Sequence, residues 1–574
     1  MKKVIIFGLL LVVVIVFSAC GNGGGGAVAG DAGAAGAEAA PAGDNGGDAV
    51  AGTGAVNPPG VFPIVDDPIT ISVFSRHIGW VADFVDNRFT EWYEELTNIR
   101  IDWHLVSEAD VDTRLNLMLA AGDLTDVIMD PWAITNTQLM VFGEQGLFIP
   151  LNDLIERYGI ETRRILSEFP TVRDMITQSD GNIYALPHID MCYHCWFPNK
   201  MWVYEPWLDT LGLAKPTNIN EFADMLRAFR DGDPNGNGLD DIVPFAGTMS
   251  SGAAGLPSIA VFIMNSFIYT DDTHLLKVDN GVLVPVFNTP EWREGLRYLQ
   301  MLHDEGLLSA ETFTQDGAQM QALNGGDHIR LGAFPSLVAW AALPGGPAHP
   351  EWTNYVPIAP LTGPTGLRQA RHNVFDTGPF AAFIITSSNP HPEASFRWAD
   401  AKYDMEITMR KYYGRIGYEI RFAEDGEIGI NGLPAIWTIL TESGAEHDQP
   451  NHAAWAHVGV HARSADFRHG QTVPPDMPNH TEKILYLATR DYYEPFAPPF
   501  EIIQPPQFFT EQQANDLMDL TVTINNHVAE MFALFIIGAA CLDNDWDTYV
   551  QTLDAMGLDR FMQIHQEAFD ARWR

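Results

Sequence analysis

The chain has 574 residues, 46% of them hydrophobic, which is enough for two or more packed, domain-sized lobes. Lys and Arg together number 33 against 74 Asp and Glu, a formal net charge of −41 at pH 7. Because this charge repels a phosphate backbone, nucleic acid is excluded as a partner, and a neutral ligand or a cation fits better.

The first twenty residues have the pattern of an export signal. Lys2 and Lys3 precede an apolar run from Val4 to Phe17, which is too short for a typical membrane-spanning helix. The run ends in "FSAC", and this looks like a bacterial lipoprotein signal, in which the cysteine, here Cys20, is lipidated. We predict a lipid anchor at Cys20, although Phe17 replaces the usual aliphatic residue; the alternative is an ordinary cleaved signal.

Residues 21–60 have the composition of a flexible tether. Of these 40 residues, 14 are Gly and 12 are Ala, and none is aromatic or basic. Such a segment cannot bury enough apolar area to offset its ordering entropy. We predict a tether with a root-mean-square reach of roughly 35 Å between the anchor and a folded body that starts at residue 61.

Predicted strands and helices alternate in the next part of the chain. Residues 69–75 ("ITISVFS") and 100–106 ("RIDWHLV") are rich in β-branched residues and predict strands, with a helix over 89–99 between them. Residues 111–130 predict a helix, a turn and a buried strand. This alternation favours α/β layers and parallel strands. Further predictions are helices at 221–232 and 291–306, a strand from Phe380, and mostly helix from about Glu511.

Several catalytic motifs are absent from the sequence, namely GxSxG, HExxH and GxxxxGK[ST]. Carboxylates are so abundant that a glycosidase pair cannot be singled out. If Cys20 is lipidated, three cysteines remain, and three do not make a disulfide framework.

One segment offers soft metal ligands at close spacing. His188, Asp190, Cys192, His194 and Cys195 fall within eight residues. A structural zinc site usually draws a second ligand pair from further along the chain, and no matching CxxC or HxxxH exists here. We favour half-buried residues beside a cleft over a metal site or a hydrolytic centre.

The segment "DPNGNGLDDI", residues 233–242, begins like the calcium loop of an EF-hand. Oxygen-bearing side chains alternate along it, and the glycines permit sharp turns. The distant glutamate of an EF-hand is replaced by Pro244, and the same residues also favour a simple turn. The candidate ligands are Asp233, Asn235, Asn237, the Leu239 carbonyl and Asp241, with Asp240 adjacent.

A longer stretch, "YEPWLDTLGLAKPTNINEFADMLRAFRDGDPNGNGLDDIVPF" (residues 204–245), resembles the family 1 extracellular solute-binding lipoproteins of ABC importers. These include large oligosaccharide-binding members related to alginate- and maltose-binding proteins. Further matches, such as "GLFIPLNDLIERY" and "NDWDTYVQTLDAMGLDRFMQIHQEAFD", run in order from residue 69 to the C-terminus. The resemblance is therefore to the whole body and not to one motif.

This resemblance implies an α/β fold of the two-lobe periplasmic-binding-protein type (type II), in which a hinge closes the lobes on a ligand. The lobes are discontinuous. We expect lobe 1 at about 61–190 plus 370–405, lobe 2 at about 191–369 plus 406–505, and C-terminal helices at about 510–574. Relatives carry an acidic pair in the calcium loop in place of the distant glutamate. Here the pair is Asp240 and Asp241, and Ile242 replaces the second expected acid; a structural Ca²⁺ is expected.

The resemblance also points to aromatic ligand contacts, because sugar rings stack on indole faces. Trp132, with Asp130 nearby, follows a buried strand of lobe 1, and Trp340 follows a strand of lobe 2. The remaining candidates are Arg76, Trp80, Trp196 and Trp202. The alternative for each of these tryptophans is that it packs in the core or at an interface and does not contact a ligand.

Together these features predict a monomeric, non-enzymatic, lipid-anchored binding protein on the outer face of the cell membrane. It would capture a carbohydrate, most simply an oligosaccharide, and deliver it to an ABC importer permease. Two alternatives stay open: a secreted glycoside hydrolase or other hydrolase, and a peptide-binding or adhesion lipoprotein on the same scaffold.

Overall fold

The computed structural model describes residues 56–79, 81–108, 110–130, 132–249, 255–271, 273–375, 381–440, 452–473 and 480–574. The signal and Cys20 lie outside these residues. Within the described ranges, no helix combines the length and apolarity needed to cross a membrane.

The first lobe is built on a four-stranded sheet of order β11-β3-β1-β2. Its strands are β1 (Ile69–His77), β2 (Ile99–Ser107), β3 (Val127–Ile128) and β11 (Ile384–Ile385). The pairs β1–β2 and β1–β3 are parallel, as predicted, whereas β11 runs antiparallel to β3. Neighbouring β1 residues face opposite cores, because Val73 packs into one hydrophobic cluster and Phe74 into the other.

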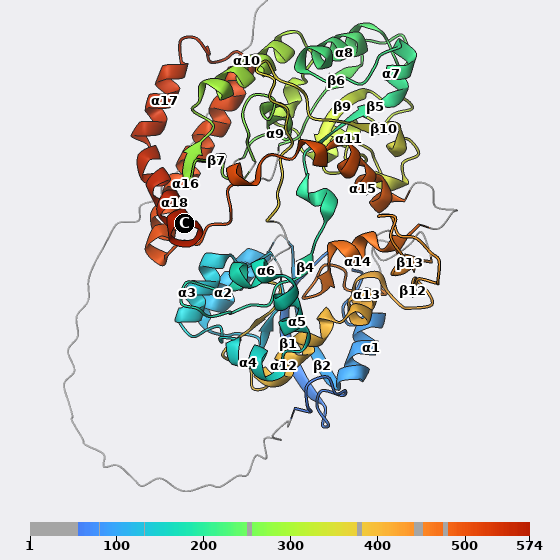
Figure 1. Ribbon diagram of the computed structural model, residues 1–574, viewed down its shortest axis with the longest axis vertical. Helices are drawn as coiled ribbons and strands as arrows, with labels where there is room; N and C mark the ends of the chain where they lie inside the picture. Colours follow the sequence, from blue (N-terminus) through green and yellow to red (C-terminus); the bar gives the residue numbers. More distant parts are fainter. Residues whose placement is uncertain are drawn as a thin grey trace, which may run out of the picture. The chain divides into compact units, whose positions relative to one another are not determined.

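Helices cover both faces of this sheet, so the lobe has three layers (Figure 1). α1 and α12 pack on the Val73 side, and α2 and α3 on the Phe74 side. The helices of this lobe are α1 (Arg88–Thr97), α2 (Val111–Ala121), α3 (Asn136–Glu144), α4 (Asn152–Tyr158), α5 (Glu161–Glu168), α6 (Pro170–Ile176), α12 (Pro392–Asp400), α13 (Met405–Tyr413) and α14 (Ala465–His469).

The second lobe has its own four-stranded sheet, of order β10-β5-β9-β6. Its strands are β5 (Lys200–Tyr204), β6 (Val243–Phe245), β9 (Leu331–Ser336) and β10 (Tyr355–Ile358). Only β6–β9 is parallel, and the pairs of β5 with β9 and β10 are antiparallel. The sheet is therefore mixed. Its strand β5 follows directly on the chain that comes from the first lobe and is not preceded by a helical crossover.

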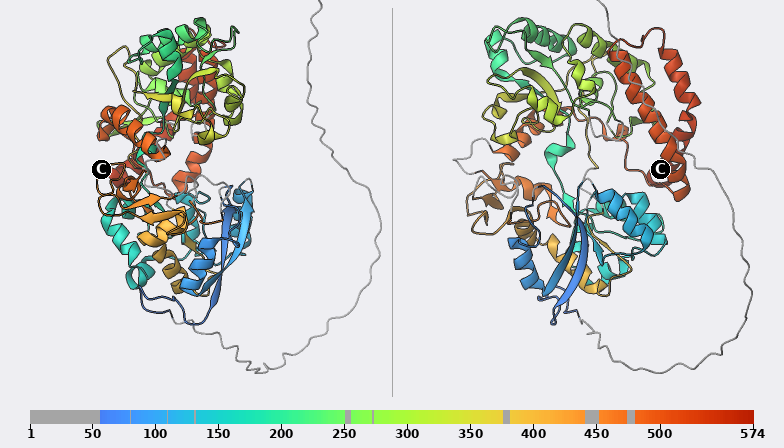
Figure 2. Two further views of the ribbon diagram at one scale, coloured as in Figure 1. Left: turned by 90° about the vertical axis from the view of Figure 1, so that its right-hand side faces the viewer. Right: turned by 180° about the vertical axis from the view of Figure 1, so that it is seen from behind.

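The helices of the second lobe and the C-terminal helices share one hydrophobic core (Figure 2). The long α16 contacts α10 and α18. These helices are α7 (Glu205–Leu211), α8 (Ile219–Asp231), α9 (Ile259–Met264), α10 (Pro290–Asp304), α11 (Gly317–Ala322), α15 (Thr481–Tyr492), α16 (Glu511–Ile536), α17 (Trp546–Ala555) and α18 (Leu558–Trp573).

The structure corrects the lobe assignment of residues 406–440 and 452–472. Trp455 lies in the core of the first lobe, where its Nε1 donates to Thr90 Oγ1 at 2.7 Å. β14 (Ala462–Arg463) also pairs with β4 (Ile189–Asp190). The adjoining small sheet contains β12 (Ile420–Phe422), β13 (Trp437–Ile439) and β15 (Gln471–Thr472). Only the later part, with Leu485 and Ala488 of α15, packs into the second core.

The packed body also begins earlier than residue 61. Val56 forms an antiparallel bridge with Val65. Asn57 Nδ2 donates to Asp66 Oδ1 at 2.9 Å, and Arg397 donates to the Asn57 carbonyl. The last residues assigned to the tether are thus part of the folded body, because their polar groups find partners there.

Candidate functional site

A cavity of about 640 Å³ lies between the two lobes. The first lobe contributes Trp132 and Asn136, the segment 269–274 of the second lobe contributes Tyr269, and the strand-free segment 371–375 contributes Arg371 and Asn373. Residues 503–506, which lead toward α16, close another side. The volume lies within the range of small-ligand sites, and the lining combines aromatic rings with amides and hydroxyls.

Trp132 is held in place by a buried ion pair. Asp130, fully buried at the end of β3, accepts a hydrogen bond from Arg76 Nε at 2.7 Å and another from the Trp132 backbone N–H at 3.0 Å. The Arg76 guanidinium also lies 5.3 Å from the centre of the Trp132 ring. The indole itself is 46% exposed. Arg76 and Asp130 are therefore supports for Trp132, because they are too buried to present a large surface to a ligand.

Histidines stand beside Trp132. The His188 ring meets the indole edge-on at a centroid distance of 6.5 Å, and the His457 ring lies at 6.3 Å. Burial lowers the pKa of His188 to about 3, so this ring is neutral at pH 7. Tyr412 Oη hydrogen-bonds to His457 Nε2 at 2.7 Å. These contacts fix the surroundings of the indole without adding a positive charge at His188.

A buried ion network lies next to this site. Asp190 Oδ1 accepts from Arg468 at 2.8 Å, and Oδ2 accepts from Arg463 at 3.3 Å. Arg468 also donates to Glu482 Oε2 at 2.9 Å. Burial opposes ionisation of Asp190, but Arg463 and Arg468 outweigh it and hold the Asp190 pKa below its ordinary value. The network joins β4, β14 and α15, so it links the first lobe to a helix of the second.

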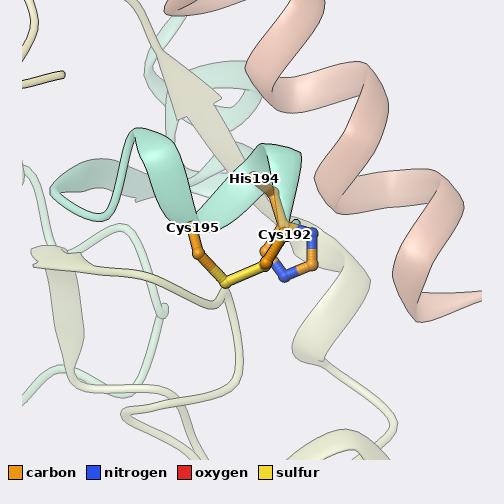
Figure 3. Close-up of side chains that lie close together, drawn as sticks. All are labelled: Cys192, His194 and Cys195. Carbon is orange, nitrogen blue, oxygen red and sulfur yellow. A yellow bond between two sulfur atoms is a disulfide. The ribbon is translucent and has the colours of Figure 1, made fainter. Parts of the chain in front are cut away.

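The segment 188–195 contains a disulfide, which the sequence analysis did not predict. Cys192, which directly precedes the 3₁₀ helix η1 (Tyr193–Trp196), is bonded to Cys195 within that helix, and His194 lies beside the bond (Figure 3). A sulfur in a disulfide is not a thiolate, so the oxidised pair is not a metal ligand. Asp190 and His188 take part in the contacts already described and not in a zinc site.

The turn formed by η1 is held by Lys200, the first residue of β5. Its Nζ donates to the carbonyls of His194 at 2.7 Å and Phe197 at 2.6 Å. Burial lowers the pKa of Lys200 to about 7. Both carbonyls lie near the end of η1, and the His194 carbonyl also accepts the backbone N–H of Phe197. Lys200 therefore fixes the segment that leads from the first lobe into the second.

The side chains of the loop 233–241 converge. Asn237 Nδ2 lies 3.2 Å from both carboxylate oxygens of Asp241, and Asn235 Nδ2 lies 3.3 Å from Oδ1. Asp233 Oδ2 accepts the N–H of Gly238 at 3.1 Å. Asp233 has φ +43°, and Gly236 and Gly238 are also left-handed. This backbone curls the loop so that its alternate side chains point inward.

Calcium fits this donor set. Asp233, Asn235, Asn237 and Asp241 supply hard oxygen ligands once each amide turns its oxygen inward, a rotation that preserves its shape. Asp240 is exposed, as Asp233 is. Arg330 Nε lies 3.3 Å from Asp241 Oδ2, so the guanidinium balances the negative charge of this carboxylate.

The remaining predicted contact residues lie elsewhere. Trp202 is fully buried in the second core, with Nε1 donating to the Ser336 carbonyl at 3.0 Å, so its assignment as a ligand contact was wrong. Trp340 is half-buried and packs edge-on against Trp352, and it is not part of the cavity lined by Trp132. Trp196 packs between the two main cores. Trp80 lies outside the described residues.

Sequence reasoning missed most of the lining. Tyr269, Arg371, Asn373 and Phe375 belong to segments without regular secondary structure or a recognisable motif. Arg371, Asn373 and Phe375 share one signal, their position, because 369–375 lies on the return crossover toward the first sheet. A search for polar and aromatic residues on that crossover would have found these three but not Tyr269.

A family model described as bacterial extracellular solute-binding protein matches residues 79–401, more than half of the chain. Among curated proteins, the fructooligosaccharide ABC transporter substrate-binding protein FusA of Streptococcus pneumoniae is 26% identical over 490 residues, which cover 83% of this chain and 85% of FusA. The polygalacturonan/rhamnogalacturonan-binding protein YtcQ of Bacillus subtilis is 25% identical and covers 40% of this chain and 43% of its own length.

Solved structures share the fold. FusA of S. pneumoniae in complex with kestose has a TM-score of 0.72 at 23% identity, and an HMO-binding, ABC-transporter-associated solute-binding protein from Bifidobacterium longum infantis has a TM-score of 0.73 at 21% identity. Each comparison covers 88% of this chain and 99% of the other. The two-lobe α/β architecture and the extended match to one family model lead to the same conclusion: the chain belongs to the bacterial extracellular solute-binding proteins.

Proposed function

We propose that the protein captures an oligosaccharide in the cavity lined by Trp132 and delivers it to the permease of an ABC importer. The observation that carries this proposal is the half-exposed indole of Trp132, which the buried Arg76–Asp130 pair holds at the cavity. An exposed, oriented aromatic face suits the C–H face of a sugar ring, and the nearby Asn136 and Asn373 suit its hydroxyls. The names of both curated relatives support a saccharide ligand.

A glycan panel tests this function. The purified protein is incubated separately with neutral fructooligosaccharides, with acidic oligogalacturonides and with a set of peptides, and both the melting temperature and the glycan products are measured. We expect one class to raise the melting temperature while its chain length stays unchanged. A shortened glycan would establish a hydrolase instead, and stabilisation by peptides but by no glycan would favour the peptide-binding alternative.

We further propose that the loop 233–241 binds a structural Ca²⁺. One solved FusA structure is that of an EF-hand mutant, which supports a comparable loop in that protein. Here the converging side chains of Asp233, Asn235, Asn237 and Asp241 support the proposal. The ion would replace Arg330 as the charge partner of Asp241 and join the end of α8 to the start of β6.

Calcium is expected to stabilise the protein, because an ion bound only by the folded state shifts the unfolding equilibrium, by about 2.7 kcal/mol at 100 times the dissociation constant. Asp233→Asn should abolish this gain with little change in the calcium-free melting temperature, since asparagine tolerates the left-handed backbone at this position. The measurement is thermal unfolding after chelation, with and without added Ca²⁺. An equal gain in melting temperature for wild type and variant would contradict Ca²⁺ binding in this loop, which would then be a simple turn.

We also propose that Cys20 carries the lipid anchor and that the Gly- and Ala-rich segment after it serves as a tether. Cys20→Ala is expected to move the protein from the membrane fraction to the soluble fraction, or to leave the signal uncleaved. Fractionation and the mass of the N-terminal peptide report both outcomes. A processed variant that stays on the membrane would contradict lipidation at this cysteine.

A further inference from the structure

A three-residue cluster, Cys192, His194 and Cys195, has no part in the cavity or in the calcium loop. One ligand atom from each of the three residues can be chosen so that all lie within 4.8 Å of one another. Cys192 and His194 are buried, and Cys195 is partly exposed. In Figure 3 one ring nitrogen of His194 lies next to the disulfide and the other points away from it. The backbone has therefore already gathered two sulfurs and an imidazole at one point.

The outward ring nitrogen of His194 faces a carboxylate. His194 Nδ1 lies 3.4 Å from Glu482 Oε1, and Glu482 Oε2 is fixed by Arg468 at 2.9 Å. Nδ1 thus faces Glu482, which leaves Nε2 on the side of the sulfurs. Metal-binding histidines commonly have this arrangement, in which the second nitrogen contacts a carboxylate that sets the tautomer and the ring orientation. Lys200 holds the same turn by donating to the His194 carbonyl at 2.7 Å.

We propose that reduction of the Cys192–Cys195 disulfide converts this cluster into a site for a zinc-like divalent cation. Two thiolates and one imidazole are the ligands that Zn²⁺ prefers, and three protein ligands leave a fourth position for solvent, which the partly exposed Cys195 side can supply. The oxidised protein has no such site. The cluster lies on the segment that leads from β4 into β5, so the metal would bind where the chain passes between the lobes.

The chemistry needs a two-electron reductant. With a water-soluble phosphine, the S–S bond accepts two electrons, the phosphine gains an oxygen atom from water to become the phosphine oxide, and the two protons of that water go to the two sulfurs. Zn²⁺ then forms two Zn–S bonds and releases both thiol protons. His194 Nε2 donates its lone pair without losing a proton.

The test uses the full chain with Cys20→Ser and Cys541→Ser, so that Cys192 and Cys195 are the only cysteines left of four. The protein is reduced with the phosphine without oxygen, loaded with Zn²⁺ or Co²⁺, and desalted. We expect about one equivalent of retained zinc, and a thiolate-to-cobalt charge-transfer absorption, in the reduced protein alone. The absorption is essential, because a chain with net charge −41 also binds cations through carboxylates, which cannot produce it.

Two variants sharpen the result. His194→Ala should weaken zinc binding at least tenfold, and Glu482→Gln, which alters the partner of the ring and not a ligand, should weaken it about 10- to 100-fold. The oxidised form of the same chain is the matched control and requires no substitution. The proposal is overturned if reduced and oxidised protein retain equal zinc, or if the reduced protein shows no thiolate-to-cobalt absorption.

Discussion

Trp132→Ala is expected to weaken saccharide binding by a factor of roughly 30, because truncation of a well-placed aromatic contact costs about 2 kcal/mol or more. The indole is 46% exposed at the cavity, so its removal should leave the melting temperature close to that of wild type. The measurement is titration calorimetry with the glycan that the panel selects, together with thermal unfolding of the same samples.

Two other tryptophans serve as controls for this experiment. Trp455 lies in the core of the first lobe, so Trp455→Ala should cost about 3–5 kcal/mol of stability while the folded fraction keeps its affinity. Trp340 packs on Trp352 and outside the cavity, so Trp340→Ala should change affinity much less than Trp132→Ala. An equal loss of affinity in Trp340→Ala would show that the ligand also contacts Trp340, outside this cavity. Native affinity in Trp132→Ala would show that the Trp132 indole does not contact the ligand.

Asp130→Asn separates the contact from its support. The asparagine side chain has nearly the shape of aspartate but lacks its negative charge. The Arg76 guanidinium is therefore left without its buried charge partner. We expect weaker binding together with lower stability, whereas Trp132→Ala lowers affinity alone. A variant with native affinity and native stability would show that the Arg76–Asp130 pair does not position Trp132.

Local patterns predicted much of the first lobe because there each element is determined by its own residues. The strand β1 was predicted from its β-branched run. Helix α8 begins at Ile219, two residues before the predicted start at Glu221, because the side chain of Asn218 caps it by accepting the N–H groups of Asn220 and Glu221. The apolar run from Phe380 was a weaker guide. Only Ile384–Ile385 pairs as a strand, because its neighbour β3 is itself two residues long.

The site could not be predicted to the same extent because its contacts join distant parts of the chain. Trp132 was predicted from its place after a buried strand, but its support by Arg76 depends on the parallel pairing of β1 and β3. Trp202 was only an aromatic candidate without such a position, and it proved to be core, since composition does not reveal that every residue of β5 is buried. The changed lobe assignment of residues 406–440 and 452–472 likewise rests on tertiary packing, as at Trp455.

Asp190 illustrates this limit most clearly, and it supports a prediction with a large expected effect on stability. Its partner Arg463 lies 273 positions further along the chain, and no local pattern connects the two. Asp190→Ala is expected to destabilise the folded state by about 3–5 kcal/mol, because removal of one member of a buried ion pair leaves the other charge uncompensated. Arg463 and Arg468 are both buried, so water cannot replace the carboxylate.

Urea unfolding at pH 7 measures this loss of unfolding free energy. The slope of that free energy against urea concentration is compared with wild type, because a changed slope indicates a changed denatured state. Asp231→Ala is the matched surface control: it also removes a carboxylate close to an arginine, at 2.6 Å from Arg230, but the pair is solvent-exposed and its loss should leave the midpoint unchanged. An unchanged midpoint in Asp190→Ala would show that the network contributes no net stability. Asp190→Leu/Arg463→Met should recover part of the loss, since it removes both charges.

The same network predicts how stability depends on pH. The pKa of Asp190 is held below its ordinary value in the folded state by Arg463 and Arg468. Its stabilising contribution is therefore complete above the pKa of an unfolded aspartate, about 3.9, and is lost as the pH falls toward the folded-state pKa. Wild type should lose stability between about pH 5 and pH 2, and Asp190→Ala should lose less over this interval because the group that takes up the proton is gone. Parallel curves for both proteins would assign the acid sensitivity to other carboxylates.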